Sequence, residues 1–192
     1  MSFVTQGRDD VRSRLQQAAL ELYRERGYDQ TTTAEIAACA GVTERTFFRY
    51  FPDKREVLFD GEGRLRSALT LAVAQVPNGL APLAILFQAF RSVAPVLEMN
   101  RSFAKPRQQL IARTPALRER ELAKISALTE ALAEALRDRG VDNQLASLGA
   151  QIGMAAFVHA VASWLSEPTA DLGACLDRAL RELEALTADA VP

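Results

Sequence analysis

The chain has 192 residues, of which 48% are hydrophobic and 24% charged, and its formal net charge is −1. This composition is ordinary for a globular protein and excludes a polybasic nucleic-acid-binding chain. The first ten residues lack the apolar core of a signal peptide, and we expect no apolar run long enough to span a membrane. Cys39 and Cys175 lie far apart without CxxC spacing, which is typical of reduced, structural cysteines. We therefore expect a cytoplasmic protein.

Helical periodicity extends over nearly the whole chain, and no strand pattern or internal repeat is visible. Gly27 ends the first helix. Asp53 is a candidate N-cap for a long fourth helix, which Gly61 and Gly63 would allow to bend. Helices are predicted over about residues 11–26, two short stretches within 31–51, and then 53–75, 81–97, 101–113, 114–140, 143–165 and 169–188. The sequence thus predicts an all-α fold of about nine helices.

Residues 31–54, TTTAEIAACAGVTERTFFRYFPDK, carry the start signals of two short helices. Thr32 followed by Glu35 is a capping box, and Thr43 is a second N-cap candidate. Gly41 allows the positive φ that a tight turn between the two helices needs. A short helix, a glycine turn and a capped second helix together predict a helix-turn-helix.

The second helix of this motif has two predicted faces. The inner face consists of Phe47, Tyr50 and Phe51, and the other of Arg45, Phe48 and Arg49. Arginine can bind guanine through two hydrogen bonds, and an aromatic ring can touch a thymine methyl group. Thr43 and the free N–H groups at the helix start suit a phosphate. The pattern therefore favours DNA recognition, and the alternative is a solvated polar face above core aromatics.

Residues 12–58 resemble the DNA-binding domain of TetR-type transcriptional repressors in the segments AALELYRERGYDQTTTAEIA, AGVTERTFFRYF and PDKREVLF. The resemblance implies phosphate contacts by Thr33 and Lys54, base-edge contacts by Arg45 and Thr46, and contacts to backbone and bases by Phe48, Arg49 and Tyr50. The chain departs from the usual pattern at Phe48, where tyrosine is common, so a phosphate hydrogen bond is lost there. Glu44 is unfavourable beside DNA, because a carboxylate repels phosphate, and the alternatives are that it favours the helix dipole or accepts from a cytosine N4.

The same resemblance divides the chain into a three-helix DNA-binding head, residues 1–51, and a helical ligand-binding and dimerisation domain, residues 52–192. Small side chains line one side of the penultimate helix, and leucines repeat along the last one. The resemblance implies that these two helices form a four-helix interface with a second copy, through Gly149, Gly153, Ala156, Ala160, Leu172, Leu176 and Leu180. An internal helical hairpin is the alternative.

Apolar side chains in the middle helices could line a pocket or fill a core. The predicted ligand-binding set is Phe87, Phe90, Phe103, Arg107, Met154, Phe157 and His159. The stretch from Ala94 to Gly140 resembles TetR members with an acyl-CoA-like ligand domain. That resemblance implies a fatty acyl or acyl-CoA effector, with Arg107 or Arg113 as its anion partner, and other hydrophobic effectors are the competitors. His159 has no neighbours at metal-ligand spacing, so no metal site is predicted.

Together with the helix-turn-helix pattern, the TetR resemblance implies a ligand-responsive DNA-binding regulator, most simply a homodimeric repressor that a small hydrophobic effector releases from a palindromic operator. It would lie in the bacterial cytoplasm and on the nucleoid when bound to DNA. No phosphate loop, metal cluster or nucleophile–histidine constellation is present in the sequence, so no catalytic residue and no cofactor are predicted. The alternatives are an activator of the same fold and a helical partner-binding module without DNA binding.

Overall fold

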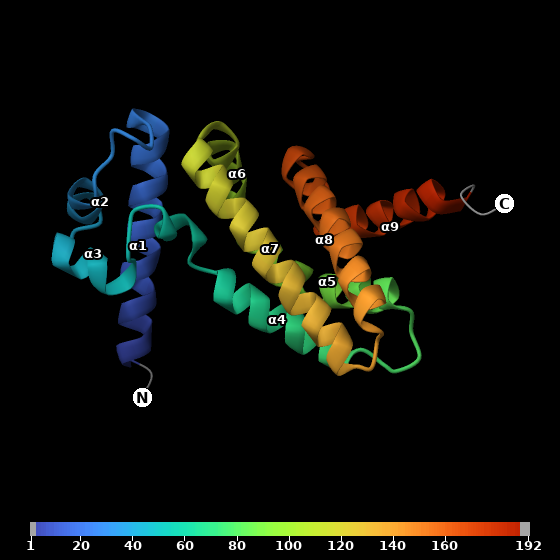
Figure 1. Cartoon of the computed structure of the whole chain (residues 1–192). Helices are drawn as coiled ribbons and strands as arrows, with labels where there is room; N and C mark the ends of the chain where they lie inside the picture. The colour runs from blue at the N-terminus through green and yellow to red at the C-terminus, as the bar shows by residue number, and fades with distance from the viewer. Residues whose placement is uncertain (1–2, 189–192) are drawn as a thin grey trace. The chain divides into compact units, whose positions relative to one another are not determined.

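The computed structural model describes residues 3–188, and this part of the chain consists of helices joined by turns and loops, without a strand. The described residues form nine α-helices, as the sequence predicts, and Figure 1 shows how they are arranged within each part of the chain. Their bounds are α1 Phe3–Arg26, α2 Thr33–Cys39, α3 Glu44–Tyr50, α4 Glu62–Gln75, α5 Pro82–Glu98, α6 Arg101–Arg113, α7 Pro115–Asp138, α8 Asn143–Ser166 and α9 Leu172–Ala188. A short 3-10 helix, η1, spans Glu56–Phe59 between α3 and α4.

The predicted continuous fourth helix is wrong, because the chain is broken at Asp60 and Gly61. The Asp53 carboxylate does accept from the backbone N–H groups of Arg55 and Glu56, at 2.8 and 3.0 Å. The turn it starts is the 3-10 segment η1, and α4 begins only at Glu62. Two glycines within three residues lower the helix propensity at this point, so a break here is physically reasonable.

The chain forms two compact units, each built from two segments that are not contiguous in the sequence. The first comprises the chain up to Gly61 together with Pro106–Glu121, and the second comprises the rest. The chain therefore passes between the units within α6 and within α7. Pro106 has no N–H to donate and lies inside α6, so that helix lacks one backbone hydrogen bond at its crossing point.

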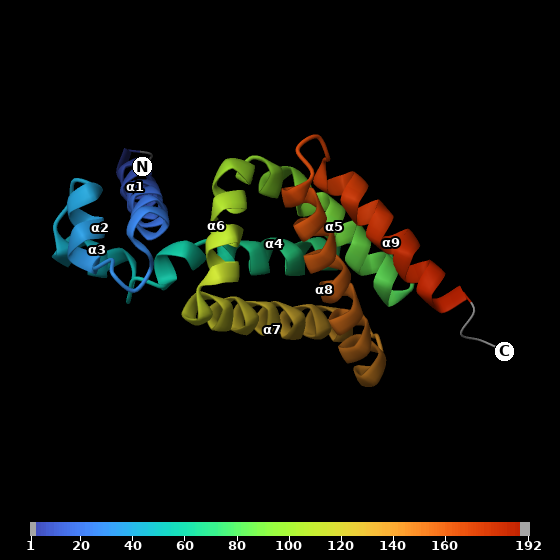
Figure 2. The same cartoon turned by 90° about the horizontal axis from the view of Figure 1, so that it is seen from above.

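The core of the second unit surrounds α5, which Figure 2 shows beside α8 and α9. The ring centroids of Phe90 and Phe157 lie 4.7 Å apart, and those of Phe87 and Phe90 lie 5.9 Å apart. At Gly153 a Cβ atom would lie 2.6 Å from Leu86 Cδ1. Glycine at this position therefore lets α8 approach α5 closely.

The predicted dimerisation residues are mostly used inside the chain. Gly149 and Gly153 face Pro82 and Leu86 of α5, and Ala160, Leu172 and Leu176 are fully buried. The remaining two, Ala156 and Leu180, are half-buried against the same core. The small-residue side of α8 thus packs on its own chain, which is the internal hairpin that the sequence left open.

The start of α9 is three residues later than predicted, because side chains fix it at Leu172. Glu98 accepts from the Leu172 N–H at 2.6 Å, and Asp171 accepts from the Ala174 N–H at 2.7 Å. Arg101 holds the preceding loop by donating to the carbonyls of Trp164 and Ala170, at 2.6 and 3.0 Å. These contacts anchor the first turn of α6 to the α8–α9 connection.

The other side of α8 leaves apolar side chains in solvent. Leu145, Leu148 and Val158 are 50%, 55% and 39% exposed. The expectation that no apolar run is long enough to span a membrane is wrong for α8, which is long and apolar enough to do so, with a mean hydropathy of 1.5 over a stretch that is 39% buried. The core helix of a soluble protein can have the same length and hydropathy. In α8, however, one side packs in the core and the other exposes apolar side chains to solvent.

Replacing Gly153 with alanine should lower the free energy of unfolding by about 1–3 kcal/mol, because the new methyl group overlaps Leu86 in a filled core. Gly63→Ala is the matched control, since a Cβ there meets nothing within 4 Å. The control should be neutral or slightly stabilising. Chemical denaturation of both variants decides the matter, and equal stability of the two would mean that α8 does not pack on α5 in this way.

Candidate DNA-binding surface

The start of α2 is fixed by the predicted capping box. Glu35 accepts from the Thr32 backbone N–H at 2.8 Å, and the Thr32 hydroxyl accepts from the Glu35 N–H at 3.2 Å. The donors on Thr32 lower the pKa of the Glu35 carboxyl, and Arg26 at 3.1 Å adds to the effect. The reciprocal bonds satisfy backbone donors that have no partner within the helix.

The turn from α2 to α3 depends on Gly41, whose φ is +70°. Val42 donates to the Ala37 carbonyl at 2.9 Å, which closes the end of α2. Arg14 on α1 donates to the Ala40 carbonyl at 2.9 Å and so holds the same turn from outside. Thr43 then caps α3 by accepting from the Thr46 N–H. The helix-turn-helix geometry is therefore built into this segment.

Phe47 orients α3 on the rest of the first unit. Its side chain is fully buried, and Phe51 is 2% exposed, so the inner face of α3 is the predicted one. Ile36 and Ala37 of α2 are buried with them. Tyr50 is only half-buried, and the Arg12 guanidinium lies 5.7 Å from its ring centroid. This packing turns the opposite face of α3 outward.

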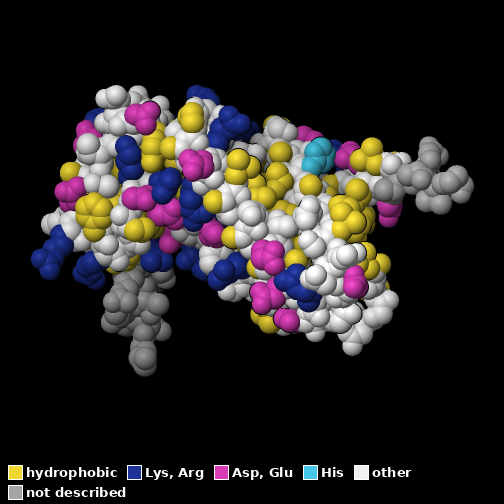
Figure 3. All heavy atoms as spheres, viewed as in Figure 1, with side chains coloured by type: hydrophobic (Ala, Val, Ile, Leu, Met, Phe, Trp, Pro, Cys, Tyr) yellow, Lys and Arg dark blue, Asp and Glu magenta, His cyan; other side chains and the backbone are white. Residues whose placement is uncertain are grey.

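Three side chains of α3 project from the outward face. Arg45 and Arg49 are exposed, and Phe48 is 52% exposed. Figure 3 shows basic and hydrophobic side chains together over this part of the first unit. Two guanidinium groups and one apolar ring thus share a surface on a short, well-capped helix, which suits insertion into a DNA groove.

The two residues expected to approach DNA at the helix starts have partners within the protein. The Thr33 hydroxyl donates to the Glu44 carboxylate at 2.5 Å, which ties the first turn of α2 to that of α3. The hydroxyls of Thr43 and Thr46 lie 3.0 Å apart. Glu44, which looked unfavourable beside DNA, therefore has a structural contact in the first unit.

Lys54 is bound to the protein backbone. Its ammonium donates to the carbonyls of Tyr28 and Thr31, at 2.8 and 2.9 Å, and lies 4.4 Å from the Tyr28 ring centroid. Its own carbonyl accepts from the buried Tyr23 hydroxyl at 2.5 Å. Burial raises the pKa of the Tyr23 phenol, so the hydroxyl stays protonated. Lys54 therefore fixes the loop before α2 through contacts that the sequence did not indicate.

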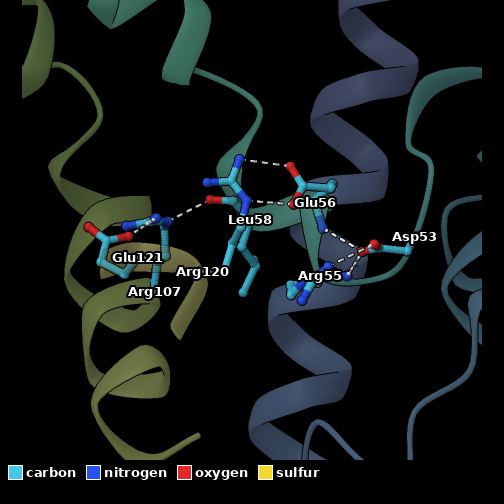
Figure 4. Close-up of polar contacts among 7 residues, drawn as sticks. All are labelled: Asp53, Arg55, Glu56, Leu58, Arg107, Arg120 and Glu121. Carbon is cyan, nitrogen blue, oxygen red and sulfur yellow. Dashed lines mark hydrogen bonds and ion pairs between the residues drawn. The ribbon is translucent and has the colours of Figure 1, made fainter. Parts of the chain in front are cut away.

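A cluster around Phe59 that the sequence did not indicate joins η1 to α6 and α7. Figure 4 shows its two ion pairs, Arg107 with Glu121 and Arg120 with Glu56. The guanidinium groups of Arg107 and Arg120 each lie 4.8 Å from the Phe59 ring centroid. Arg107 pairs with Glu121 at 2.7 Å, and Arg120 binds both carboxylate oxygens of Glu56, at 2.6 and 3.0 Å. We call Phe59 with these two ion pairs the arginine clamp.

The arginine clamp is well shielded from solvent. Phe59 is 4% exposed, and the side chains of Arg107 and Arg120 are 16% and 19% exposed. Arg107 also donates to the Leu58 carbonyl at 2.6 Å. Partly desolvated cation–π and bidentate contacts are stronger than the same contacts at an open surface. Arg107, predicted to hold a ligand anion, is thus part of a structural cluster.

The remaining predicted ligand residues fall into two groups. The buried core of the second unit contains Phe87, Phe90, Met154 and Phe157, and Phe103 is half-buried. His159 lies at the surface with 61% of its side chain exposed, 3.2 Å from Glu182 of α9. The structure therefore brings four apolar members together and leaves His159 outside that cluster.

A separate groove of about 1040 Å³ lies between α4 and α7 in the second unit and contains none of the predicted ligand residues. Arg66, Thr70, Glu134 and Asp138 are among its lining residues. Cys39 is exposed and Cys175 is buried. No group of three or more potential metal ligands occurs among the residues described.

Comparisons with known proteins agree with this geometry. Residues 15–60 match the family model for bacterial regulatory proteins of the tetR family, and residues 80–188 match the MftR C-terminal domain. The chain therefore belongs to the TetR family of transcriptional regulators, with a C-terminal domain of the MftR type. Proteins of this family are DNA-binding transcriptional regulators and not enzymes. This chain is therefore a transcriptional regulator and not an enzyme.

Individual relatives support the same assignment. The chain is 32% identical over 139 residues to the HTH-type transcriptional regulator TcmR of Streptomyces glaucescens, a match that covers 69% of this chain and 62% of that relative's length. Among solved structures, the Thermus thermophilus repressor FadR in complex with lauroyl-CoA is 30% identical with a TM-score of 0.58, over 94% of this chain and 96% of that one. NalD of Pseudomonas aeruginosa, at 18% identity and a TM-score of 0.63 over 92% and 96%, shares the fold.

Acid should weaken the head partly through Glu35. Its pKa is lowered in the folded state, so its contribution to stability is present above its unfolded pKa and is lost as pH falls through the folded value. Glu35→Gln keeps a side chain that can form the capping box but cannot titrate. Between about pH 5 and pH 3, wild type should lose stability more steeply than Glu35→Gln in thermal unfolding. Parallel losses would exclude the capping-box carboxylate as a source of acid sensitivity.

Proposed function

We propose that this chain is a homodimeric repressor that binds a palindromic operator through α3 and leaves it when a fatty acyl or acyl-CoA effector binds. The observation that carries the DNA-binding part is the outward face of α3, where Arg45, Phe48 and Arg49 are exposed while Phe47 anchors the helix. With a net charge of −1 on the whole chain, affinity has to come from these local cations.

The proposed set of DNA-contacting residues is smaller than the set that the resemblance implied. Arg45 and Arg49 would bind base edges and phosphate, and Tyr50 would lie at the edge of the contact. Thr43 and Thr46 would contact DNA through the start of α3, which they cap. Thr33 and Lys54 would position the helices, because their polar groups bind Glu44 and the loop before α2.

The outward side of α8 is the proposed dimer interface. Leu148, Ile152, Ala155, Val158 and Ala162 follow one another at helical spacing on that side, and none of the five is fully buried. A continuous apolar stripe of this kind marks a contact surface. A second copy is the occupant that family membership supports, and two recognition helices about 34–36 Å apart would reach successive major grooves.

The proposed effector site is the apolar cluster of Phe87, Phe90, Met154 and Phe157, with Phe103 at its edge. The FadR relative that is 30% identical binds lauroyl-CoA, and the MftR-type domain covers this region. The rings are in contact in this structure, so an acyl chain would have to part α5 from α8. Ligand would then favour a conformation with lower DNA affinity, and the coupling would be reciprocal.

The arginine clamp is the proposed route from effector to DNA. α6 and α7 continue from the clamp into the second unit, where ligand would bind. Within the first unit, η1 leads directly back to Lys54, which holds the loop before α2. A shift of α6 or α7 would therefore act on η1 and through it on the helix-turn-helix.

Fluorescence anisotropy with DNA from upstream of the gene tests this proposal. Wild type should bind selectively, and Arg45→Ala should lose about 1–3 kcal/mol of that selectivity. Arg24 is an exposed arginine on α1, so Arg24→Ala is the control and should bind as wild type.

Lauroyl-CoA added to the complex should release the DNA from wild type and from Arg118→Ala. It should release less DNA from Arg120→Ala, because that substitution breaks the arginine clamp.

Each outcome of that titration has a separate meaning. Equal selectivity of wild type and Arg45→Ala would contradict base reading by α3. Selective DNA binding by wild type without release by lauroyl-CoA would contradict the proposed acyl effector. It would leave the proposed repressor function intact. Equal release from Arg118→Ala and Arg120→Ala would contradict the clamp as the route, because these arginines are close neighbours on α7 and only Arg120 lies beside Phe59.

Val158→Asp should convert the dimer to a monomer, since it places a charge in the centre of the proposed interface. Leu71→Asp is the control, because Leu71 is 58% exposed on α4, outside that stripe. Light scattering after size-exclusion chromatography gives the mass of each variant. A dimer that survives Val158→Asp would place the interface elsewhere, and a wild-type monomer would exclude the dimer itself.

A further inference from the structure

The surface of α3 contains one large apolar side chain that is half exposed to solvent in the free protein. Phe48 is 52% exposed, whereas Phe47 and Phe51 on the same helix are buried. Its ring meets the Phe47 ring edge-to-face, with centroids 5.4 Å apart and planes at 84°. The ring is thus held against a buried neighbour and presented to solvent between Arg45 and Arg49.

The neighbouring polar side chains form contacts within the protein. Glu44 is bound by the Thr33 hydroxyl, and the hydroxyls of Thr43 and Thr46 face one another at the cap. Arg45, Phe48 and Arg49 are therefore the α3 side chains best placed to distinguish base pairs. Two of them are cations with a preference for guanine, and Phe48 must follow a different chemistry.

A phenyl ring has no donor for a phosphate oxygen and no acceptor for a base amino group. Its exposure is relieved only by contact with other apolar atoms. In the major groove the apolar group on a base edge is the C5 methyl of thymine, which cytosine, adenine and guanine lack. A tyrosine in the same place could bind phosphate through its hydroxyl, an option that phenylalanine does not have.

We infer that Phe48 is a specificity-determining residue that selects thymine in each operator half-site by packing its ring on the C5 methyl group. This inference rests on the proposed DNA-binding function and adds the chemical feature that is read. Arg45 and Phe48 are three residues apart, hence about 4.5 Å along the helix axis. That spacing compares with a rise of about 3.4 Å per base pair, so the thymine lies one or two base pairs from the position that Arg45 reads.

Deoxyuridine substitution tests the inference, because replacing dT by dU removes the methyl group and keeps base pairing. The operator is first isolated by its selective binding to wild type, and each thymine is then replaced in both half-sites. At one thymine position wild-type affinity should fall about fourfold per half-site, the effect of losing one buried methyl group. Phe48→Ala should bind the dT and dU operators equally, and Phe48→Leu should keep part of the preference.

The controls separate the possible failures. Arg49→Ala changes a neighbour on the same face and should retain the full dT-to-dU difference while its dependence on salt concentration decreases. No difference at any thymine for wild type would overturn the inference while leaving the DNA-binding function intact. A difference that persists in Phe48→Ala would assign the methyl group to another residue. Failure of wild type to select any DNA would instead refute the proposed function itself.

Discussion

The contact of the Arg107 and Arg120 guanidinium groups with the Phe59 ring is the interaction on which the first unit depends. It joins three segments that are distant in the sequence, and each arginine is neutralised by a carboxylate, so the cluster brings no unpaired charge into the core. From η1 the contacts continue through the Lys54 carbonyl to Tyr23 and through its ammonium to the loop before Thr32. The position of α2, and of α3 with it, therefore depends on a cluster outside the helix-turn-helix.

The local features of the head could be predicted from the sequence because neighbouring residues create them. The capping box at Thr32 and Glu35, the cap at Thr43 and the positive φ of Gly41 all involve residues within a few positions of one another. Periodicity likewise identified the buried Phe47 and the exposed face of α3. The nine helices followed from the same kind of signal, with errors at the fourth helix, which is broken at Asp60 and Gly61, and at the start of α9, where Glu98 of α5 binds the Leu172 N–H.

Long-range partners explain what the sequence could not show. Lys54 and Arg107 looked like anion-binding residues because a free cation and a bound one are identical in the sequence. The carbonyls of Tyr28 and Thr31 accept from the Lys54 ammonium. Glu121 and the Leu58 carbonyl bind the Arg107 guanidinium. The small residues of α8 present the same difficulty. A helix face of small residues has the same sequence whether it packs on α5 or on a second copy of the chain. His159, on the opposite side, pairs with Glu182.

Selection from a pool of random-sequence DNA by the full-length protein tests the central claim, that two copies of α3 read DNA together. The account predicts enrichment of an inverted repeat whose half-sites lie about one helical turn apart, or a multiple of it. It also predicts guanine and thymine at neighbouring positions of each half-site, for Arg45 and Phe48. Recovery of DNA without a repeat, or no enrichment over the starting pool, would contradict a dimeric repressor that acts through this surface.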